Sequence, residues 1–549
     1  MRKSNIGKMT ASVLAAALCM GTLAGCGSTP AGTAGGETNA QETKAEETKA
    51  AEGSEGEADT EGAAEGEVSY PLNSDETLTI WTPQALPAGY TDYNEVPFYK
   101  NLGKQIGVNI EWSGPSTGED AKKAYSLLMA AEELPDIIFY WPLQNGEETD
   151  IADGIYVELT DYQEYFPDYL KAAEATGEIK NTRMDNGGIG TFWMMRGDER
   201  LNVYQGMVVR QDWLDECGLE VPDTLEEYDT VARTFHEKYG AVFTQVDSRS
   251  MNSVNTAFNA TKAYYVNDEG EIVLGAIEDN YREYLEFMNQ WYEDGILDPD
   301  FATMDAKMQE TKVLNDQTGL AVTSSGTVSG WISNLEANGN SAEFVAAPYP
   351  PKEDGETPEF GHARNMVVSF GARITTDCEN IPLACQVLNW GYTEEGQLYW
   401  NFGEEGVSYE MKDGEPVFTD VVMKDEKGID HGINTYAGAA GNFVTVQDYR
   451  MWEQKNTDVG VAAVDVWAET NQKDHVLPNL SSTQEENEAI TNDSAAINNY
   501  IDEMYYKFIM GEESLDDANW QKYVDTIKSM NVDNILKIKN EQLDRWNNR

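Results

Sequence analysis

Short apolar runs alternate with amphipathic helical patterns from Thr77 onward, which is typical of an α/β protein. Strands are predicted at 78–81, 108–112 and 134–139, where apolar residues are consecutive or alternate. Helices are predicted between them, at 98–106 and 120–133, where the apolar residues have helical spacing. This βαβαβ order predicts a doubly wound lobe, in which ligands bind beyond the carboxyl ends of the strands.

Two later helices carry clear signals at their ends. Thr224 and Glu227 form the pattern of a capping box at the start of the first helix. Gly295 follows the second helix, whose apolar positions include Tyr281 and Trp291, and is expected to end it. The turn sequences at 267–270 and 412–415 lie between β-like runs and predict hairpins.

The N-terminus has the pattern of an export signal. Three basic residues in the first eight positions precede an uncharged Ala- and Leu-rich run that is too short to span a membrane comfortably. The run ends in Leu23-Ala24-Gly25-Cys26, which resembles a bacterial lipobox. We therefore expect a signal peptide at 1–25, with Cys26 diacylated on its sulfur as the first mature residue. An ordinary signal peptide that happens to contain a cysteine is the alternative.

A low-complexity segment separates this signal from the folded part. Residues 26–70 consist mainly of Gly, Ala, Thr, Ser and Glu, and they lack the apolar residues needed to offset the entropy of ordering. We expect a disordered acidic tether there. The whole chain has 97 acidic and 38 basic side chains and a net charge of −59, of which the tether supplies only a small part. Such a surface repels nucleic-acid phosphates and anionic lipid headgroups, so neither is expected as a partner.

The chemistry-bearing residues indicate no enzyme. Cys217, Cys378 and Cys385 remain after the first 26 residues, and no C-x-x-C pair is present, so a zinc site is not expected and a disulfide is possible but not indicated. The four histidines are scattered along the chain. No phosphate loop, nucleophile elbow or calcium loop is found, and Glu404 and Glu405 are adjacent and are expected to point apart. We expect no cofactor and no metal.

Several segments, in their order and spacing, resemble a known family. They are the strand ending in Trp81, the run 134–138, the segments 209–219 and 221–228, and the segments 292–301 and 401–410. On these segments the chain resembles the extracellular solute-binding proteins of ABC transporters, in the branch of maltose-binding protein, and most of all the longer lipoprotein members grouped with LplA. The resemblance covers roughly residues 75–545.

The resemblance implies a fold and its boundaries. The family fold is two doubly wound α/β lobes joined by a hinge, the type II periplasmic-binding-protein fold. Placed on this sequence, lobe 1 uses 71–195 and 348–398, and lobe 2 uses 200–345 and 402–549. Passages between the lobes are expected near 191–204, 345–349 and 398–402. A monomer is expected.

Aromatic residues at loop positions are the first candidates for the binding site, because sugar C–H faces stack on rings. Trp141 and Trp331 match positions at which maltose-binding protein places sugar-stacking aromatics. The Asp-Arg pair that follows its first aromatic is absent here, so maltose is not implied. Packing within the core is the alternative for each tryptophan, and surface ion pairing is the alternative for each charged candidate. The expected ligand-binding residues are Trp81, Tyr140, Trp141, Trp193, Asp247, Arg249, Trp331 and Arg364.

The functional hypothesis is a lipid-anchored protein on the extracellular side of the cell membrane. It captures a carbohydrate, an oligosaccharide, and delivers it to the permease subunits of an ABC transporter without chemistry on the sugar. A surface glycoside hydrolase is one alternative. A binder of cationic peptides or polyamines, suggested by the acidic charge, is another.

Overall fold

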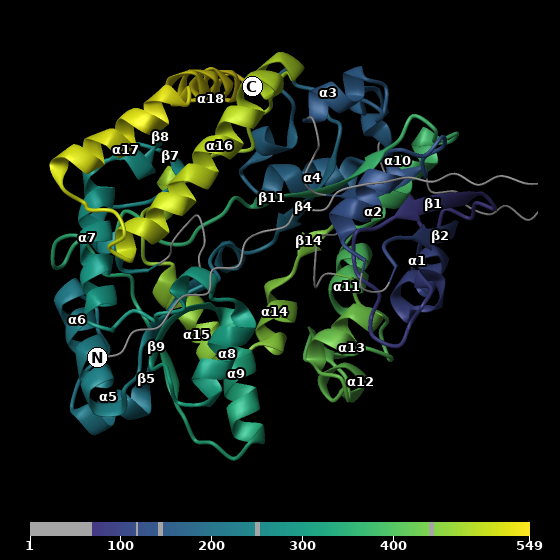
Figure 1. Ribbon diagram of the computed structural model, residues 1–549. Helices are drawn as coiled ribbons and strands as arrows, with labels where there is room; N and C mark the ends of the chain where they lie inside the picture. The colour runs from purple at the N-terminus through teal and green to yellow at the C-terminus, as the bar shows by residue number, and fades with distance from the viewer. Residues whose placement is uncertain (1–67, 117–118, 141–145, 247–252, 439–443) are drawn as a thin grey trace, which may run out of the picture. The chain divides into compact units, whose positions relative to one another are not determined.

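The computed structural model describes residues 68–116, 119–140, 146–246, 253–438 and 444–549. Its elements are organised around two separate β-sheets, each with its own hydrophobic core (Figure 1). We use the name first lobe for 68–196 together with 367–447, and second lobe for 205–347 together with 458–549. The chain belongs to the two-lobed α/β class that the sequence predicts.

The first lobe is built on a six-stranded sheet with the order β14-β4-β11-β3-β1-β2. The pairs β1–β2 and β1–β3 are parallel, whereas β11 runs antiparallel to both β3 and β4. The strands are β1 (Thr77–Trp81), β2 (Asn109–Ser113), β3 (Ile137–Tyr140), β4 (Phe192–Arg196), β11 (Val367–Ile374) and β14 (Val446–Gln447). The helices are α1 (Pro97–Ile106), α2 (Ala121–Leu128), α3 (Glu147–Ala152), α4 (Pro167–Ala175), α10 (Ile381–Trp390) and α11 (Glu394–Phe402).

A small subdomain follows α11 in the first lobe. The hairpin turn at Asp413–Gly414 joins β12 (Tyr409–Lys412) to β13 (Glu415–Phe418), as predicted. Two short helices, α12 (Asp420–Met423) and α13 (Ile429–Tyr436), complete a separate apolar cluster with the hairpin.

The second lobe is built on a four-stranded sheet with the order β10-β5-β9-β6. Its strands, with the separate hairpin β7–β8, are β5 (Gln205–Arg210), β6 (Phe243–Thr244), β7 (Tyr264–Val266), β8 (Ile272–Leu274), β9 (Leu320–Ser324) and β10 (Phe344–Ala347). Its helices up to β10 are α5 (Gln211–Cys217), α6 (Leu225–Tyr239), α7 (Asp279–Glu293), α8 (Ala306–Leu314) and α9 (Ser325–Ala337).

The helix ends in this lobe form as their sequences predict. The Thr224 side chain accepts a hydrogen bond from the Glu227 amide, and the Glu227 carboxylate accepts one from the Thr224 amide, which completes the capping box of α6. After α7, Gly295 adopts a φ of +75°, a left-handed conformation that favours glycine.

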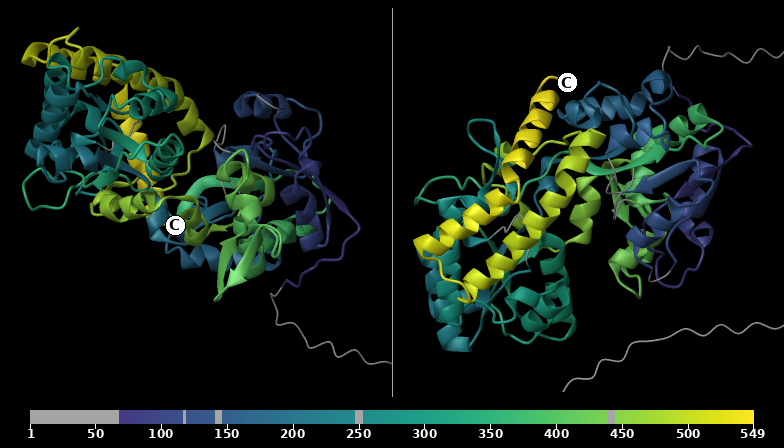
Figure 2. Two further views of the ribbon diagram at one scale, coloured as in Figure 1. Left: turned by 90° about the horizontal axis from the view of Figure 1, so that it is seen from below. Right: turned by 45° about the horizontal axis from the view of Figure 1, so that its top comes forward.

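The C-terminal helices add to the core of the second lobe. The chain continues through α14 (Tyr449–Lys455), α15 (Asp458–Trp467), α16 (Gln484–Ile509), α17 (Asp517–Ser529) and α18 (Val532–Asn547). Figures 1 and 2 show α16 and α18 side by side, and α16 also packs on α7. Apolar residues of α16, α17 and α18 belong to the same cluster as the four-stranded sheet.

The chain passes between the two sheets in three segments. The sheets are linked at 197–204, between β4 and β5, and at 348–366, between β10 and β11. The third link was expected near 398–402. Instead, β14 returns to pair with β4, so the chain remains in the first lobe until after Gln447. Because β14 has only two residues, its sequence shows no alternation of apolar and polar positions from which a strand could be predicted.

Candidate functional site

Trp81 ends β1, at the carboxyl end where parallel strands place ligand-binding residues. Its side chain is buried, with 4% exposed, and its ring lies tilted against the ring of Tyr125, with centroids 5.9 Å apart. The Tyr125 hydroxyl in turn lies 3.1 Å from the hydroxyl of Tyr156. Trp81 therefore supports a buried aromatic cluster at this end of the sheet.

A buried arginine connects this cluster to β4. The guanidinium of Arg373, on β11, lies over the ring of Tyr156 at 5.0 Å from its centroid. Its Nη1 forms an ion pair with Asp150 at 3.0 Å, and its Nε donates to Thr191 Oγ1 at 3.0 Å. Thr191 Oγ1 then donates to Glu147 Oε1 at 2.8 Å. These bonds hold α3, β11 and the start of β4 in fixed relation.

Trp193 lies on β4 and lines a cavity of about 370 Å³, which is within the usual range of small-ligand pockets. The indole is 6% exposed, and its Nε1 has no hydrogen-bond partner among the described residues. Other side chains and backbone around the cavity are mainly uncharged and polar. The lining residues are Gly146, Glu147, Asn181, Arg183, Trp193, Ser369, Pro478, Asn479, Leu480, Ser481, Ser482 and Asn487.

The cavity wall is held in place by hydrogen bonds between distant segments. Asn181 Oδ1 accepts from the Asn479 amide at 3.0 Å, and Ser369 Oγ donates to Asn479 Oδ1 at 3.2 Å. The segment 478–482 is thereby fixed on the first lobe. An indole ring beside amide and hydroxyl groups is a combination that can stack on a sugar face and bind its hydroxyl edge.

Glu147 is the carboxyl group most affected by burial in this cavity. Its pKa is raised from the ordinary value by desolvation, although Arg373 and the Thr191 hydroxyl act in the opposite direction. Burial therefore outweighs both stabilising neighbours.

Arg364 lies in the link between β10 and β11 and is exposed. Its guanidinium lies over the Tyr204 ring, 4.9 Å from the centroid. Arg196, the last residue of β4, lies 5.8 Å from the centroid of the same ring, and His362 makes an edge contact at 4.2 Å. The structure thus gathers two arginines, a tyrosine and a histidine where the first and second links meet.

Of the other expected binding residues, the structure describes Trp331 and the backbone of Tyr140. Trp331 lies inside α9 rather than in a loop, because Ser324 caps this helix directly after β9 and puts Trp331 on its buried face. The ring is 1% exposed and packs against Phe344, so it contributes to the core of the second lobe, and ligand contact there stays a prediction.

Tyr140 ends β3. Trp141, Asp247, Arg249 and the lipidation site Cys26 lie outside the described residues.

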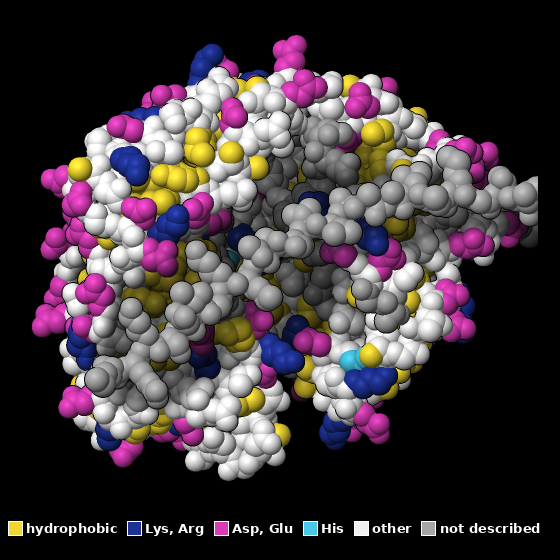
Figure 3. Space-filling model, viewed as in Figure 1, with side chains coloured by type: hydrophobic (Ala, Val, Ile, Leu, Met, Phe, Trp, Pro, Cys, Tyr) yellow, Lys and Arg dark blue, Asp and Glu magenta, His cyan; other side chains and the backbone are white. Residues whose placement is uncertain are grey.

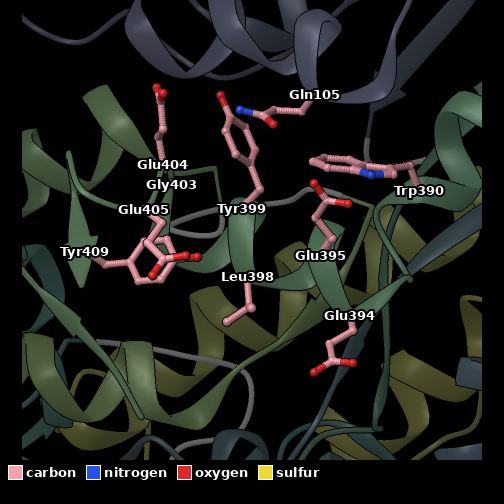
Figure 4. Close-up of a pocket in the computed structure, with 10 residues that line it drawn as sticks. All are labelled: Gln105, Trp390, Glu394, Glu395, Leu398, Tyr399, Gly403, Glu404, Glu405 and Tyr409. Atoms are coloured by element: carbon pink, nitrogen blue, oxygen red, sulfur yellow. The ribbon is translucent and has the colours of Figure 1, made fainter. Parts of the chain in front are cut away.

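Figure 4 shows a second cavity, of about 560 Å³, beside α11. Its lining includes Gln105, Trp390, Tyr399 and Tyr409 together with four glutamates, at 394, 395, 404 and 405. The side chains of Glu404 and Glu405 point in different directions, as expected from their adjacency (Figure 4). The Glu404 carboxylate accepts a hydrogen bond from Asn101.

No group of three or more His, Cys, Asp or Glu side chains is placed to hold a metal ion in the part of the chain that the structure describes. None of the described helices combines the length and apolarity needed to cross a membrane. Cys217, Cys378 and Cys385 are free thiols, and burial raises the pKa of the Cys378 thiol to about 12.

Sequence reasoning missed Arg196, Glu147 and Asn479. Arg196 did carry a signal, because it is a single charge at the end of the apolar run 192–195. Glu147 and Asn479 carried none, since each is one of many similar residues in the chain. They reach the Trp193 cavity only through tertiary contacts.

The amino-acid sequence is similar to those of known bacterial proteins. The family model described as bacterial extracellular solute-binding protein matches residues 79–398. The lipoprotein LipO of Bacillus subtilis is 25% identical over 366 residues, which are 63% of this chain and 70% of LipO. The fructooligosaccharide ABC transporter substrate-binding protein FusA of Streptococcus pneumoniae is 22% identical over 532 residues, 87% of this chain and 92% of FusA.

Solved structures show the same fold. The crystal structure of the alginate-binding protein AlgQ2 without calcium ion is 20% identical and has a TM-score of 0.67. The similarity covers 87% of this chain and 100% of that structure. At this identity the likeness concerns the fold, which is the two-lobed one expected from the sequence.

Proposed function

Since this chain belongs to the bacterial extracellular solute-binding proteins of ABC transporters, we propose that it captures an oligosaccharide and delivers it to the transporter's permease subunits. The ligand is held by aromatic stacking and by hydrogen bonds to sugar hydroxyls. The permease recognises the ligand-bound protein.

The Trp193 cavity is the observation that carries this proposal. It combines a ring, an indole N–H without a partner among the described residues, and several amide and hydroxyl groups. A buried donor without a partner costs free energy, and a sugar hydroxyl can supply the missing acceptor. The expected binding residues Trp81, Trp141, Trp193, Tyr140, Asp247, Arg249, Trp331 and Arg364 remain part of the proposal.

The proposal includes attachment to the membrane through Cys26. Support comes from the lipobox-like sequence Leu23-Ala24-Gly25-Cys26 and from the similarity to a protein named as a lipoprotein. Acyl chains contribute about 0.8 kcal/mol per buried methylene, so a diacylated cysteine anchors a protein stably. The protein then acts as a monomer on the extracellular side of the cell membrane.

The proposal also includes the absence of chemistry on the ligand. The carboxyl groups at and near the Trp193 cavity are engaged within the protein, Glu147 by Thr191 and Asp150 by Arg373. Figure 3 shows acidic side chains spread over the outer surface on this face, which supports a role in solubility. A binder of cationic peptides would instead need acids concentrated in its site.

Calorimetric titration of the purified full-length protein in detergent, over a panel of neutral and acidic oligosaccharides, tests the proposal. Binding of at least one oligosaccharide without release of a smaller sugar is the expected result. Binding of polyamines or cationic peptides but of no oligosaccharide would refute it, and so would turnover of a glycoside that a carboxylate substitution abolishes.

A further inference from the structure

Arg196 and Arg364 belong, with Arg183, to the few described arginines that form no ion pair with a described carboxylate. Most described arginines lie within ion-pairing distance of a carboxylate, as Arg200 does with Asp198 and Arg210 does with Asp212. Arg196 and Arg364 form no such pair with any described residue. A guanidinium without a counter-charge is unexpected in a protein with 97 acidic side chains.

The surroundings of Arg196 make this lack of a partner costly. Its Nε is buried and has no hydrogen-bond partner among the described residues. Desolvation, with Arg364 nearby, lowers the pKa of Arg196 to about 10, so it stays charged at neutral pH. A buried charge normally requires pairing, because removing it from water is expensive. Pairing with an anion would therefore offset the cost of burying this guanidinium.

The groups that contact the two guanidiniums do not cancel their charge. Both guanidiniums lie over the Tyr204 ring, and His362 packs against this ring. The pKa of His362 is lowered to about 3 by burial and by the two arginines, so the imidazole is neutral at physiological pH. Arg196 and Arg364 thus provide two fixed positive charges with aromatic support.

Arg196, unlike Arg364, also lines a cavity large enough for a ligand. This cavity of about 550 Å³ lies between α4, the end of β4 and the hairpin β12–β13. Three carboxylates also line it: Asp168 and Asp448 are engaged by Asn389 and Arg450 respectively, whereas Glu394 is exposed. Lys171 adds a further positive side chain to the lining.

We propose that Arg196 and Arg364 bind a carboxylate of the transported ligand, and that this ligand is an acidic oligosaccharide containing uronic acid. The inference rests on the proposed function, because it assigns the chemical class of the oligosaccharide. The relatives do not decide this class, since one is named for fructooligosaccharides, which are neutral, and another for alginate, which is acidic. A planar guanidinium pairs with a carboxylate through two parallel hydrogen bonds, which gives both affinity and direction.

Calorimetry with matched ligands tests this inference. The probes are oligomers of galacturonic, mannuronic and glucuronic acid, each compared with its methyl ester, which keeps the sugar but removes the charge. At least one oligouronate is expected to bind. Its methyl ester is expected to bind at least about tenfold more weakly. The affinity for the acid is also expected to fall as salt rises, because the contact is ionic.

Two variants and a control locate the effect. Arg364→Gln changes an exposed residue and is expected to fold normally and to lose about tenfold in affinity for the oligouronate. Arg196→Gln is expected to lose at least as much. Arg200→Gln, whose charge is paired with Asp198, is expected to retain the affinity. Melting temperatures of all three report on folding.

The outcomes separate this inference from the proposed function. Binding of a neutral oligosaccharide, with equal affinity in Arg364→Gln, overturns the acidic class and leaves oligosaccharide capture intact. Equal binding of an oligouronate and its ester overturns the role of the arginines. Binding of no oligosaccharide at all overturns the proposed function itself.

Discussion

At the residue scale, the first lobe depends on polar side chains that fix one another inside the protein. Glu147, Thr191, Arg373 and Asp150 are linked in series by hydrogen bonds and one ion pair, and Trp193 lies beside one end of the series. The sequence marked Trp81 and Trp193 as binding candidates, and contact of either with a ligand stays a prediction. It did not predict the series, because its bonds join residues that are distant along the chain, 44 positions for Thr191 and Glu147 and 223 for Arg373 and Asp150.

Substitution of Trp193 tests its role in ligand binding. Trp193→Ala removes the ring and the N–H, and we expect affinity for the oligosaccharide to fall roughly tenfold or more. Trp193→Phe keeps a ring but removes the N–H, and we expect an intermediate loss. Calorimetry measures both, with melting temperatures as a check because the residue is buried. Unchanged affinity in the stably folded alanine variant would show that Trp193 only packs.

The ion pair of Arg373 and Asp150 tests the cost of breaking a buried pair. Each side chain is 4% exposed, so Asp150→Asn leaves a buried guanidinium without its counter-charge. We expect the free energy of unfolding to fall by about 3–5 kcal/mol in denaturant titration. Asp198→Asn, at the more exposed pair with Arg200, is the matched control and is expected to cost about 1 kcal/mol or less.

Glu147 gives a prediction about pH. Its folded-state pKa lies above the ordinary value of 4.5, so the folded state holds the proton more tightly than the unfolded state. Its contribution to stability is greatest below pH 4.5 and is lost as pH rises through the raised pKa. Glu147→Gln removes this component. Urea titrations at several pH values should show a smaller decline for the variant over that window, whereas parallel declines would contradict the assignment.

At the element scale, local signals predicted the element types well and some boundaries poorly. The strands β1 and β2, the helix α1 and both hairpins lie where the apolar patterns put them. The helix expected over 120–133 ends at Leu128, because the residues after it are largely exposed and have no apolar face to bury. The short strand β14 joins the first sheet only through its pairing with β4, which no local pattern encodes.

The capping box of α6 is a test at this scale. Thr224→Ala removes the side-chain oxygen that accepts from the Glu227 amide, and we expect a loss of about 1 kcal/mol in the free energy of unfolding. Thr234→Ala, in the same helix, removes only a bond to the carbonyl of Thr230 and is expected to change stability little. Equal losses in the two variants would mean that the cap is not the source of the effect.

At the scale of the whole molecule, the family and the fold follow from the order of many weak segments. The binding site follows less well, because several expected residues lie in 141–145 and 247–252, outside the described part of the chain. Trp331 matched a stacking position in the family, but the helix that starts at Ser324 places it in the core. Contact of Trp331 with a ligand stays a prediction.

The lipid anchor is a prediction about the whole protein. Cys26→Ala removes the sulfur that is to be acylated, so we expect the variant to leave the detergent-soluble membrane fraction. Fractionation of cells and medium, followed by immunoblotting, measures this. Recovery of the wild-type protein from the medium would contradict anchoring. Recovery of the Cys26→Ala variant from the membrane fraction would point to another anchor.

The free cysteines of the two lobes differ in a way that helps experiments. Cys217, on α5 of the second lobe, is half-buried, whereas Cys378 and Cys385 in the first lobe are buried, with thiol pKa values raised by burial. At neutral pH a maleimide dye or spin label is therefore expected to react at Cys217 first among the described thiols. One engineered cysteine on the surface of the first lobe would complete a pair of labels. The distance between the two labels, measured with and without sugar, would report on whether the two lobes move relative to each other when sugar binds.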